Sequence, residues 1–235
     1  MKILLARKLA AEFLGTLFLV ATVVGSGIMA ERLAGGNSAL ALLANTIATG
    51  AALVTLILAF GPISGAHLNP AVTFADALEG GVSWGAAIQY MCVQILGGIA
   101  GTCTAHLMFG LPVISISQHV RSGPAQVFSE FVATFGLMSV IWGCSRARSS
   151  TVPFAVGSYI VAAYWFTAST SFANPAVAMA RSLSDTFSGI RPVDVPYFVL
   201  AQFAGAVAAT FLFRWLVPGI SAQSKDVMVA HDDLR

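Results

Sequence analysis

The sequence predicts an all-α membrane protein with six transmembrane helices and two shorter re-entrant half-helices, arranged as an inverted repeat. Three observations lead to this fold class. Only 9% of the 235 residues are charged, whereas 57% are hydrophobic and the mean hydropathy is +0.82. The hydrophobic residues gather in stretches long enough to cross a bilayer. The two halves of the chain also carry the same short motifs in the same order.

The composition requires a lipid environment. A soluble domain carries about 25% charged residues, and this chain has too few charges to cover a water-exposed surface. The net charge of +2 and the scattered basic residues do not suggest a nucleic-acid partner. The cysteines Cys92, Cys103 and Cys144 have no CxxC spacing and no nearby His cluster, so we expect no metal site, disulfide or cofactor.

Six stretches approach the roughly 20 apolar residues that a span needs. They run near 9–30, 38–60, 84–108, 126–146, 151–168 and 196–217. The first stretch has no clear cleavage site, so we expect a retained helix rather than a signal peptide. Lys and Arg are more frequent at the ends that lie inside when the N-terminus is cytoplasmic, which predicts two cytoplasmic termini.

Two further apolar stretches, 69–79 and 174–183, have only half the length of a span. Each opens with the same tripeptide, Asn69-Pro70-Ala71 in the first half and Asn174-Pro175-Ala176 in the second. Proline is tolerated at the first helical position, and asparagine before it caps a helix. We therefore expect two short helices that begin at these motifs.

The repeat has further landmarks. Ala11–Thr16 (AEFLGT) is echoed by Ser129–Thr134 (SEFVAT), and Gln94–Gly97 is echoed by Gln202–Gly205. Each half has three spans, an odd number, so the second half is inverted in the membrane. We assign one channel-like domain to residues 1–217, with repeats near 8–108 and 126–217, and a cytoplasmic tail to 218–235.

The paired Asn-Pro-Ala motifs, with one glutamate in the first span of each half, resemble the aquaporin and aquaglyceroporin (major intrinsic protein) family. The flanking segments Ser64–Thr73 and Ser171–Ala176 strengthen the resemblance, which runs from about residue 8 to 217. It implies a passive channel for small uncharged solutes in the cell inner (plasma) membrane, assembled as a homotetramer.

The resemblance also implies roles for particular residues. The side-chain amides of Asn69 and Asn174 donate hydrogen bonds to the passing solute, and Glu12 and Glu130 support the loops that precede the half-helices. Two half-helix N-termini at the bilayer centre disfavour cations and protons. A ladder of pore-lining carbonyls is implied at Gly65, Ala66, His67, Leu68, Thr170, Phe172 and Ala173.

In the family, four positions form the outer selectivity filter. Counting without gaps from the Asn-Pro-Ala motifs places them at Thr49, Ala162, Ser171 and Val177. Most members carry Arg at the last position, so the resemblance implies a wide filter without arginine. Arg181 lies one helical turn beyond Val177 and is a candidate for the vestibule; the alternative is a structural arginine that pairs with Asp185 or with loop carbonyls.

The segment that follows the second motif, 177–187, also resembles bacterial aquaglyceroporins found with arsenic-resistance genes. This similarity implies neutral arsenite as a solute, although glycerol, urea and water fit the same filter. A gradient-driven secondary transporter is an alternative, but only Glu12 and Glu130 are available inside the spans for coupling. A water-selective aquaporin and a closed structural protein are further alternatives; no nucleophile–base pair or phosphate loop supports an enzyme.

Overall fold

The computed structural model describes residues 3–147 and 149–217; the predicted tail 218–235 lies outside this range. All regular structure in the described residues is helical. The elements are α1 (Leu5–Leu33), α2 (Ser38–Ser64), α3 (Pro70–Glu79), α4 (Trp84–Met108), α5 (Pro124–Ala147), η1 (Ser149–Thr151), α6 (Val152–Phe166), α7 (Pro175–Arg181), η2 (Pro192–Asp194) and α8 (Val195–Leu216).

These helices confirm the predicted fold class. Five long helices of the described chain, α1, α2, α4, α5 and α8, are long and apolar enough to cross a membrane. The sixth, α6, has only 15 residues and is preceded by the single turn η1. The half-helices α3 and α7 have 10 and 7 residues, so neither can span a bilayer.

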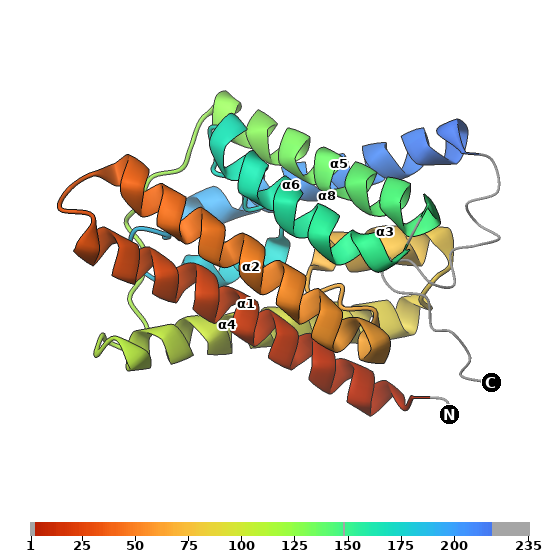
Figure 1. Ribbon diagram of the computed structural model, residues 1–235, viewed down its shortest axis with the longest axis horizontal. Helices are drawn as coiled ribbons and strands as arrows, with labels where there is room; N and C mark the ends of the chain where they lie inside the picture. Colours follow the sequence, from red (N-terminus) through yellow and green to blue (C-terminus); the bar gives the residue numbers. More distant parts are fainter. Residues whose placement is uncertain (1–2, 148, 218–235) are drawn as a thin grey trace.

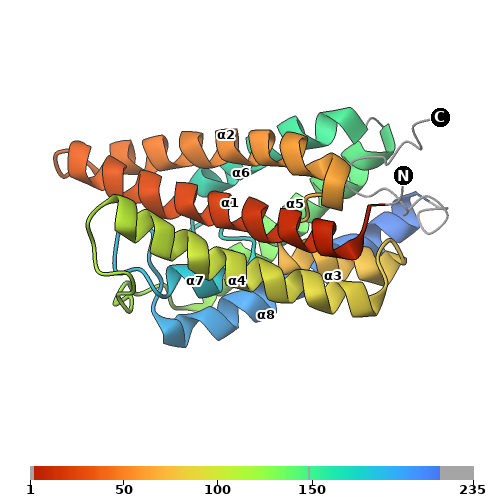
Figure 2. The same ribbon diagram turned by 90° about the horizontal axis from the view of Figure 1, so that it is seen from below.

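The two halves of the chain repeat one packing scheme. In the first half α1 packs against α2 and α4, and in the second half α5 packs against α6 and α8. Helices α2 and α6 contact each other and join the halves. The half-helices α3 and α7 lie toward opposite ends of the bundle (Figure 2), and each contacts both α4 and α8. The beginning of α1 and the end of α8 lie at the same end (Figure 1).

Glycines allow the helices of each half to approach closely. A Cβ atom added to Gly97 of α4 would lie 2.4 Å from the carbonyl oxygen of Phe13 on α1. In the second half, a Cβ atom on Gly205 of α8 would lie 2.5 Å from the carbonyl oxygen of Phe131 on α5. Equivalent glycines thus bring equivalent helix pairs into backbone contact, which is how small residues act between helices in lipid.

The candidate pore

Two loops with an unusual backbone precede the half-helices. Ala66 and Leu68 have φ of 47° and 50°, and Thr170, Ser171 and Ala173 have φ of 60°, 50° and 47°. Residues with a Cβ rarely adopt this left-handed region, and they keep it only where the surroundings impose it. The positive φ values recur at the matching positions 66 and 171, and 68 and 173.

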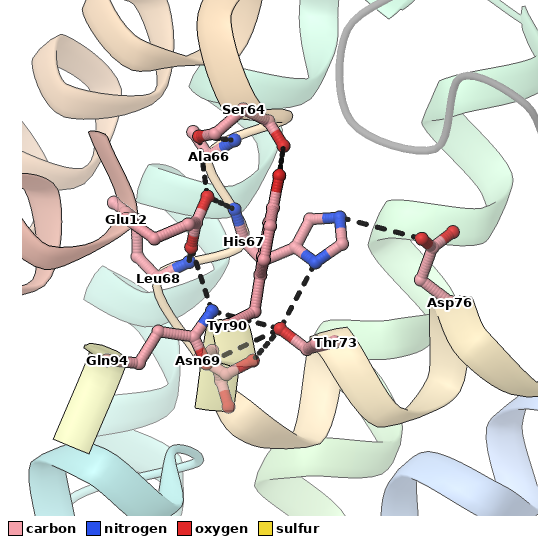
Figure 3. Close-up of polar contacts among 10 residues, drawn as sticks. All are labelled: Glu12, Ser64, Ala66, His67, Leu68, Asn69, Thr73, Asp76, Tyr90 and Gln94. Atoms are coloured by element: carbon pink, nitrogen blue, oxygen red, sulfur yellow. Dashed lines mark hydrogen bonds and ion pairs between the residues drawn. The ribbon is translucent and has the colours of Figure 1, made fainter. Parts of the chain in front are cut away.

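Glu12 of α1 holds the first loop. Its Oε1 accepts hydrogen bonds from Ser64 Oγ (2.6 Å) and the His67 amide (3.0 Å), and its Oε2 accepts from the Leu68 amide (2.7 Å) and Gln94 Nε2 (2.8 Å) (Figure 3). The side chain is completely buried. Four donors around one carboxylate compensate for the loss of water at this depth.

Glu130 of α5 holds the second loop in the same way. Its Oε1 accepts from the Phe172 amide and its Oε2 from the Ala173 amide, both at 2.9 Å. Gln202 Nε2 donates to Oε2 at 2.6 Å, as Gln94 donates to Glu12. Glu130 is also fully buried. The glutamate and glutamine of each repeated motif therefore serve one purpose, which is to fix a left-handed loop.

The two Asn-Pro-Ala motifs meet and are bonded to each other. Asn69 Oδ1 caps α3 by accepting from the Ala71 amide (2.9 Å), and Asn174 Oδ1 caps α7 by accepting from the Ala176 amide (3.0 Å). Asn69 Nδ2 donates to the Ala173 carbonyl and Asn174 Nδ2 donates to the Leu68 carbonyl, both at 2.8 Å. An amide nitrogen has two N–H groups, so each asparagine keeps one further donor.

These bonds separate the seven predicted pore-lining carbonyls into two groups, paired and unpaired. The carbonyls of Leu68 and Ala173 accept the asparagine amides. Within the described chain, five predicted carbonyls accept no hydrogen bond, those of Gly65, Ala66, His67, Thr170 and Phe172. An unpaired carbonyl inside a membrane protein costs free energy. A solute that donates hydrogen bonds to these carbonyls would remove that cost.

A narrow cavity of about 50 Å³ runs past both motifs. Asn69, Asn174, His67 and Ser171 line it together with aliphatic residues from four helices. The aliphatic residues are Leu19 and Val23 of α1, Leu53 and Ile57 of α2, Leu137 and Ile141 of α5, and Val156 and Ile160 of α6. The path therefore has apolar walls with a few polar groups, an arrangement typical of sites for small molecules.

Of the four predicted filter residues, Thr49, Ser171 and Val177 line this cavity and Ala162 does not. Ala162 is exposed on the outer face of α6, so its assignment was wrong. Tyr164 takes its place: it is 3% exposed and its Oη lies 3.3 Å from Thr49 Oγ1. Successive helical residues are rotated by about 100°, so the two-residue difference turns Ala162 away from the cavity.

The expected filter without arginine also needs correction, because Arg181 lines the same cavity as Val177. Arg181 is only 2% exposed, and its Nε donates to the Ser188 carbonyl. Its guanidinium carbon lies 3.5 Å from the centre of the Phe172 ring. The expected alternative of a bond to a loop carbonyl therefore holds, while Asp185 instead accepts from the Gln118 amide. Arg181 Nη1 and Ser171 Oγ are buried without a hydrogen-bond partner.

A wider vestibule of about 420 Å³ lies on the other side of Arg181. Arg121, in the loop between α4 and α5, lines it and donates to the carbonyls of Gly189 (2.7 Å), Ser169 (3.2 Å) and Phe187 (3.5 Å). Sequence reasoning missed Arg121, since nothing in the pattern around a loop arginine indicates a pore. His119 lines the vestibule too; burial, followed by the nearby charges of Arg121 and Arg181, lowers its pKa.

The first half-helix carries an acidic residue, Asp76, where the second carries Arg181. The ring of His67 lies between Thr73 and Asp76 of α3 (Figure 3), with Nδ1 3.1 Å from Thr73 Oγ1 and Nε2 3.7 Å from Asp76 Oδ2. Asp76 follows Asn69 by seven residues, as Arg181 follows Asn174. The repeat therefore places an acidic and a basic residue at equivalent positions of the two half-helices.

The fold and the pore define a membrane channel made of two inverted halves. Residues 1–170 match the family described as Major intrinsic protein. The chain therefore belongs to the Major intrinsic protein family, which groups it with membrane channels for small solutes rather than with enzymes.

Particular relatives narrow the class. The chain is 58% identical over 213 residues to the aquaglyceroporin AqpS of Rhizobium meliloti (strain 1021), and the match covers 91% of each protein. It is 34% identical over 224 residues to aquaporin A of Dictyostelium discoideum, covering 88% of this chain and 77% of the other. The X-ray structure of the aquaglyceroporin from Plasmodium falciparum has the same fold, with a TM-score of 0.72 at 21% identity, and covers 93% of this chain and 100% of that one.

Proposed function

We propose that the protein is a passive channel for small uncharged solutes that carry several hydroxyl groups, such as glycerol. The observation that supports this most is the cavity at the meeting point of the half-helices. Its walls are aliphatic, and its polar groups include the buried, unpartnered Ser171 Oγ and Arg181 Nη1. A polyol satisfies such groups with its hydroxyls while its carbon atoms contact the apolar wall.

Cations meet two barriers in this pore. The N-termini of α3 and α7 both lie beside the cavity, and each presents the positive end of a helix dipole. Arg181 adds a full positive charge to the lining. We therefore expect cations and protons to be excluded, and a proton leak in sealed liposomes would contradict this expectation.

The finer identity of the solute rests on relatives and on chemistry. Neutral arsenite, As(OH)₃, is a compact trihydroxy molecule, and it presents hydroxyls to the pore as glycerol does. The resemblance to channels found with arsenic-resistance genes makes it the second solute that we propose. A water-selective pore is the competing possibility, because Tyr164 and Arg181 are large side chains with polar groups and so make the filter narrower and more polar.

Two further parts of the proposal concern the assembly and its place. We propose a homotetramer with one pore in each copy, located in the plasma membrane. We also propose that both termini face the cytoplasm. The beginning of α1 and the end of α8 lie at one end of the bundle (Figure 1), and the distribution of Lys and Arg favours a cytoplasmic position for that end.

The test is stopped-flow light scattering on proteoliposomes, with water, glycerol and arsenite as solutes. We expect wild type to pass all three, Val177→Arg to lose glycerol and arsenite while keeping water, and Tyr164→Ala to pass glycerol faster. Ala162→Val, on the exposed face of the same helix, is the matched control and leaves all fluxes unchanged. A wild-type protein that passes only water would establish the water-selective alternative.

A further inference from the structure

The outer vestibule carries positive charge without an acidic counterpart in its lining. Three of its ten lining residues are basic, namely His119, Arg121 and Arg181, and none is Asp or Glu. At about 420 Å³ the vestibule is much larger than the cavity beyond it. It therefore has room for a hydrated or polyatomic anion.

A bound anion would compensate the buried positive charge of Arg181. Its guanidinium makes no ion pair with a carboxylate in the described chain, and it contacts the Ser188 carbonyl and the face of Phe172 instead. A buried charge normally needs an opposite charge or a full set of hydrogen bonds. Its Nη1 has neither, and the side chain lines both the vestibule and the cavity.

Arg121 provides a second charge that is already held in place. Four of its hydrogen bonds go to Gly189, Ser169, Thr170 and Phe187, and all of the acceptors are uncharged. Its guanidinium carbon lies 5.1 Å from the centre of the Phe172 ring, which Arg181 also contacts. The two arginines are therefore fixed around one aromatic ring. In the described residues neither guanidinium is hydrogen-bonded or ion-paired to a carboxylate, although the Arg121 backbone amide donates to Asp194 Oδ2 at 2.9 Å and the buried Glu130 lies near both arginines. A rigid pair of this kind loses little entropy when it binds an anion.

From this geometry we propose that the outer vestibule is a binding site for a small oxyanion, held by Arg181 and Arg121 and approached by His119. An anion at this point sits between the vestibule and the pore, because Arg181 lines both. Its binding therefore blocks solute flux. The block rests on the proposed channel function, whereas the binding does not.

Sulfate is a suitable probe because it stays doubly charged across the pH range in which histidine titrates. Trp165 lines the vestibule, so tryptophan emission of the purified full-length protein reports binding without any flux. We expect saturable quenching or enhancement by sodium sulfate, and no such change with sodium chloride at equal ionic strength. Trp165→Phe removes the signal. In proteoliposomes, sulfate slows glycerol flux over the same concentration range.

Variants identify the site. Arg181→Gln weakens sulfate binding about tenfold or more, the ratio expected when one charge-assisted hydrogen bond is lost. Arg32→Gln is the matched control, because Arg32 is exposed, lies outside the vestibule lining and donates to the Phe109 carbonyl at 3.3 Å, and it binds sulfate like wild type. His119→Glu is a second disruptive variant at an exposed position, and it keeps the test valid where Arg181→Gln fails to fold.

The site also predicts a pH dependence. Burial is the main cause that lowers the pKa of His119, and the charges of Arg121 and Arg181 lower it further. The charges of Glu31 and Asp185 act in the opposite direction and raise it. The ring is therefore neutral at pH 7 and gains its proton only as the pH falls. Sulfate then binds more tightly at lower pH, and His119→Gln abolishes this change.

Two results would overturn the inference. The first is emission that responds equally to sulfate and chloride, or a sulfate affinity that is the same in Arg181→Gln and His119→Glu as in wild type. The second is sulfate binding that leaves glycerol flux unchanged. This result would contradict only the proposed block of flux and not the anion site. Absence of glycerol flux in sulfate-free buffer instead contradicts the proposed function, and the fluorescence titration still decides on the anion site.

Discussion

At the scale of single residues, two buried carboxylates determine the shape of the pore. Glu12 and Glu130 each accept hydrogen bonds from two successive backbone amides of a loop that contains residues with positive φ. Such a loop is strained on its own. The carboxylates stabilise it and so leave the loop carbonyls unpaired toward the solute path. A charge inside the membrane is here a structural element of the pore.

The hydrogen bonds of Glu12 predict the effect of replacing its carboxylate by an amide. In Glu12→Gln, one oxygen becomes an NH₂ group that faces the donors of His67 or Leu68, so at least one buried amide loses its partner. An unpaired buried donor costs about 1–3 kcal/mol. We expect a lower midpoint in thermal unfolding in detergent and reduced solute flux. Glu31→Gln, at an exposed position of the same helix, is the control; equal stability of the two variants would contradict the role given to Glu12.

Three of the four filter residues could be located from the sequence, and one could not. Thr49, Ser171 and Val177 follow from counting back and forward from the Asn-Pro-Ala motifs, because short, strained loops fix the spacing. Ala162 fails because a count of residues does not determine the rotation of α6. The residues that line the cavity, Val156, Ile160 and Tyr164, follow an i, i+4 pattern. Every face of α6 is apolar in sequence, so no contrast marked that face in advance.

At the scale of elements, the fold depends on equivalent contacts in the two halves. The predicted spans agree with the helices to within a few residues at each end, because long apolar stretches and Pro or Gly boundaries are strong local signals. The packing of α1 on α4 and of α5 on α8 was not predicted from the sequence and emerges from the structure. The roles of Arg121 and the α4–α5 loop came from tertiary contacts that no local pattern encodes.

The glycine contacts give a prediction at this scale. In Gly97→Ala the new methyl group lies 2.4 Å from the Phe13 carbonyl oxygen, so α1 and α4 must separate. Overpacking of this kind costs about 1–3 kcal/mol, and we expect a matching loss of stability in SDS unfolding. Gly85→Ala is on the same helix with no atom within 4 Å of the new methyl group, and it leaves stability unchanged or slightly higher. Equal stability of the two variants would contradict the close contact between α1 and α4 at Gly97.

At the scale of the whole molecule, the inverted repeat produces a channel with chemically different ends. The backbone of the two halves is nearly equivalent, with matched loops, caps and glutamates. The side chains at the seventh position after each asparagine differ, since Asp76 lies at one end and Arg181 at the other. The two halves thus supply a symmetric frame for the pore, and Arg121 and Arg181 give only the vestibule mouth a basic lining. Which mouth faces the outside therefore matters for any charged inhibitor.

The proposed orientation is testable with single cysteines on opposite faces. Ser122 lies in the loop between α4 and α5, Ser150 lies in η1 between α5 and α6, and both are exposed. Since α5 crosses the membrane between them, they must be on different sides. In a background with Cys92, Cys103 and Cys144 replaced by alanine, a membrane-impermeant maleimide should label Ser122→Cys in intact cells and Ser150→Cys only in inside-out vesicles. The reverse pattern would place the basic vestibule in the cytoplasm, and labelling of both from one side would contradict the transmembrane course of α5 itself.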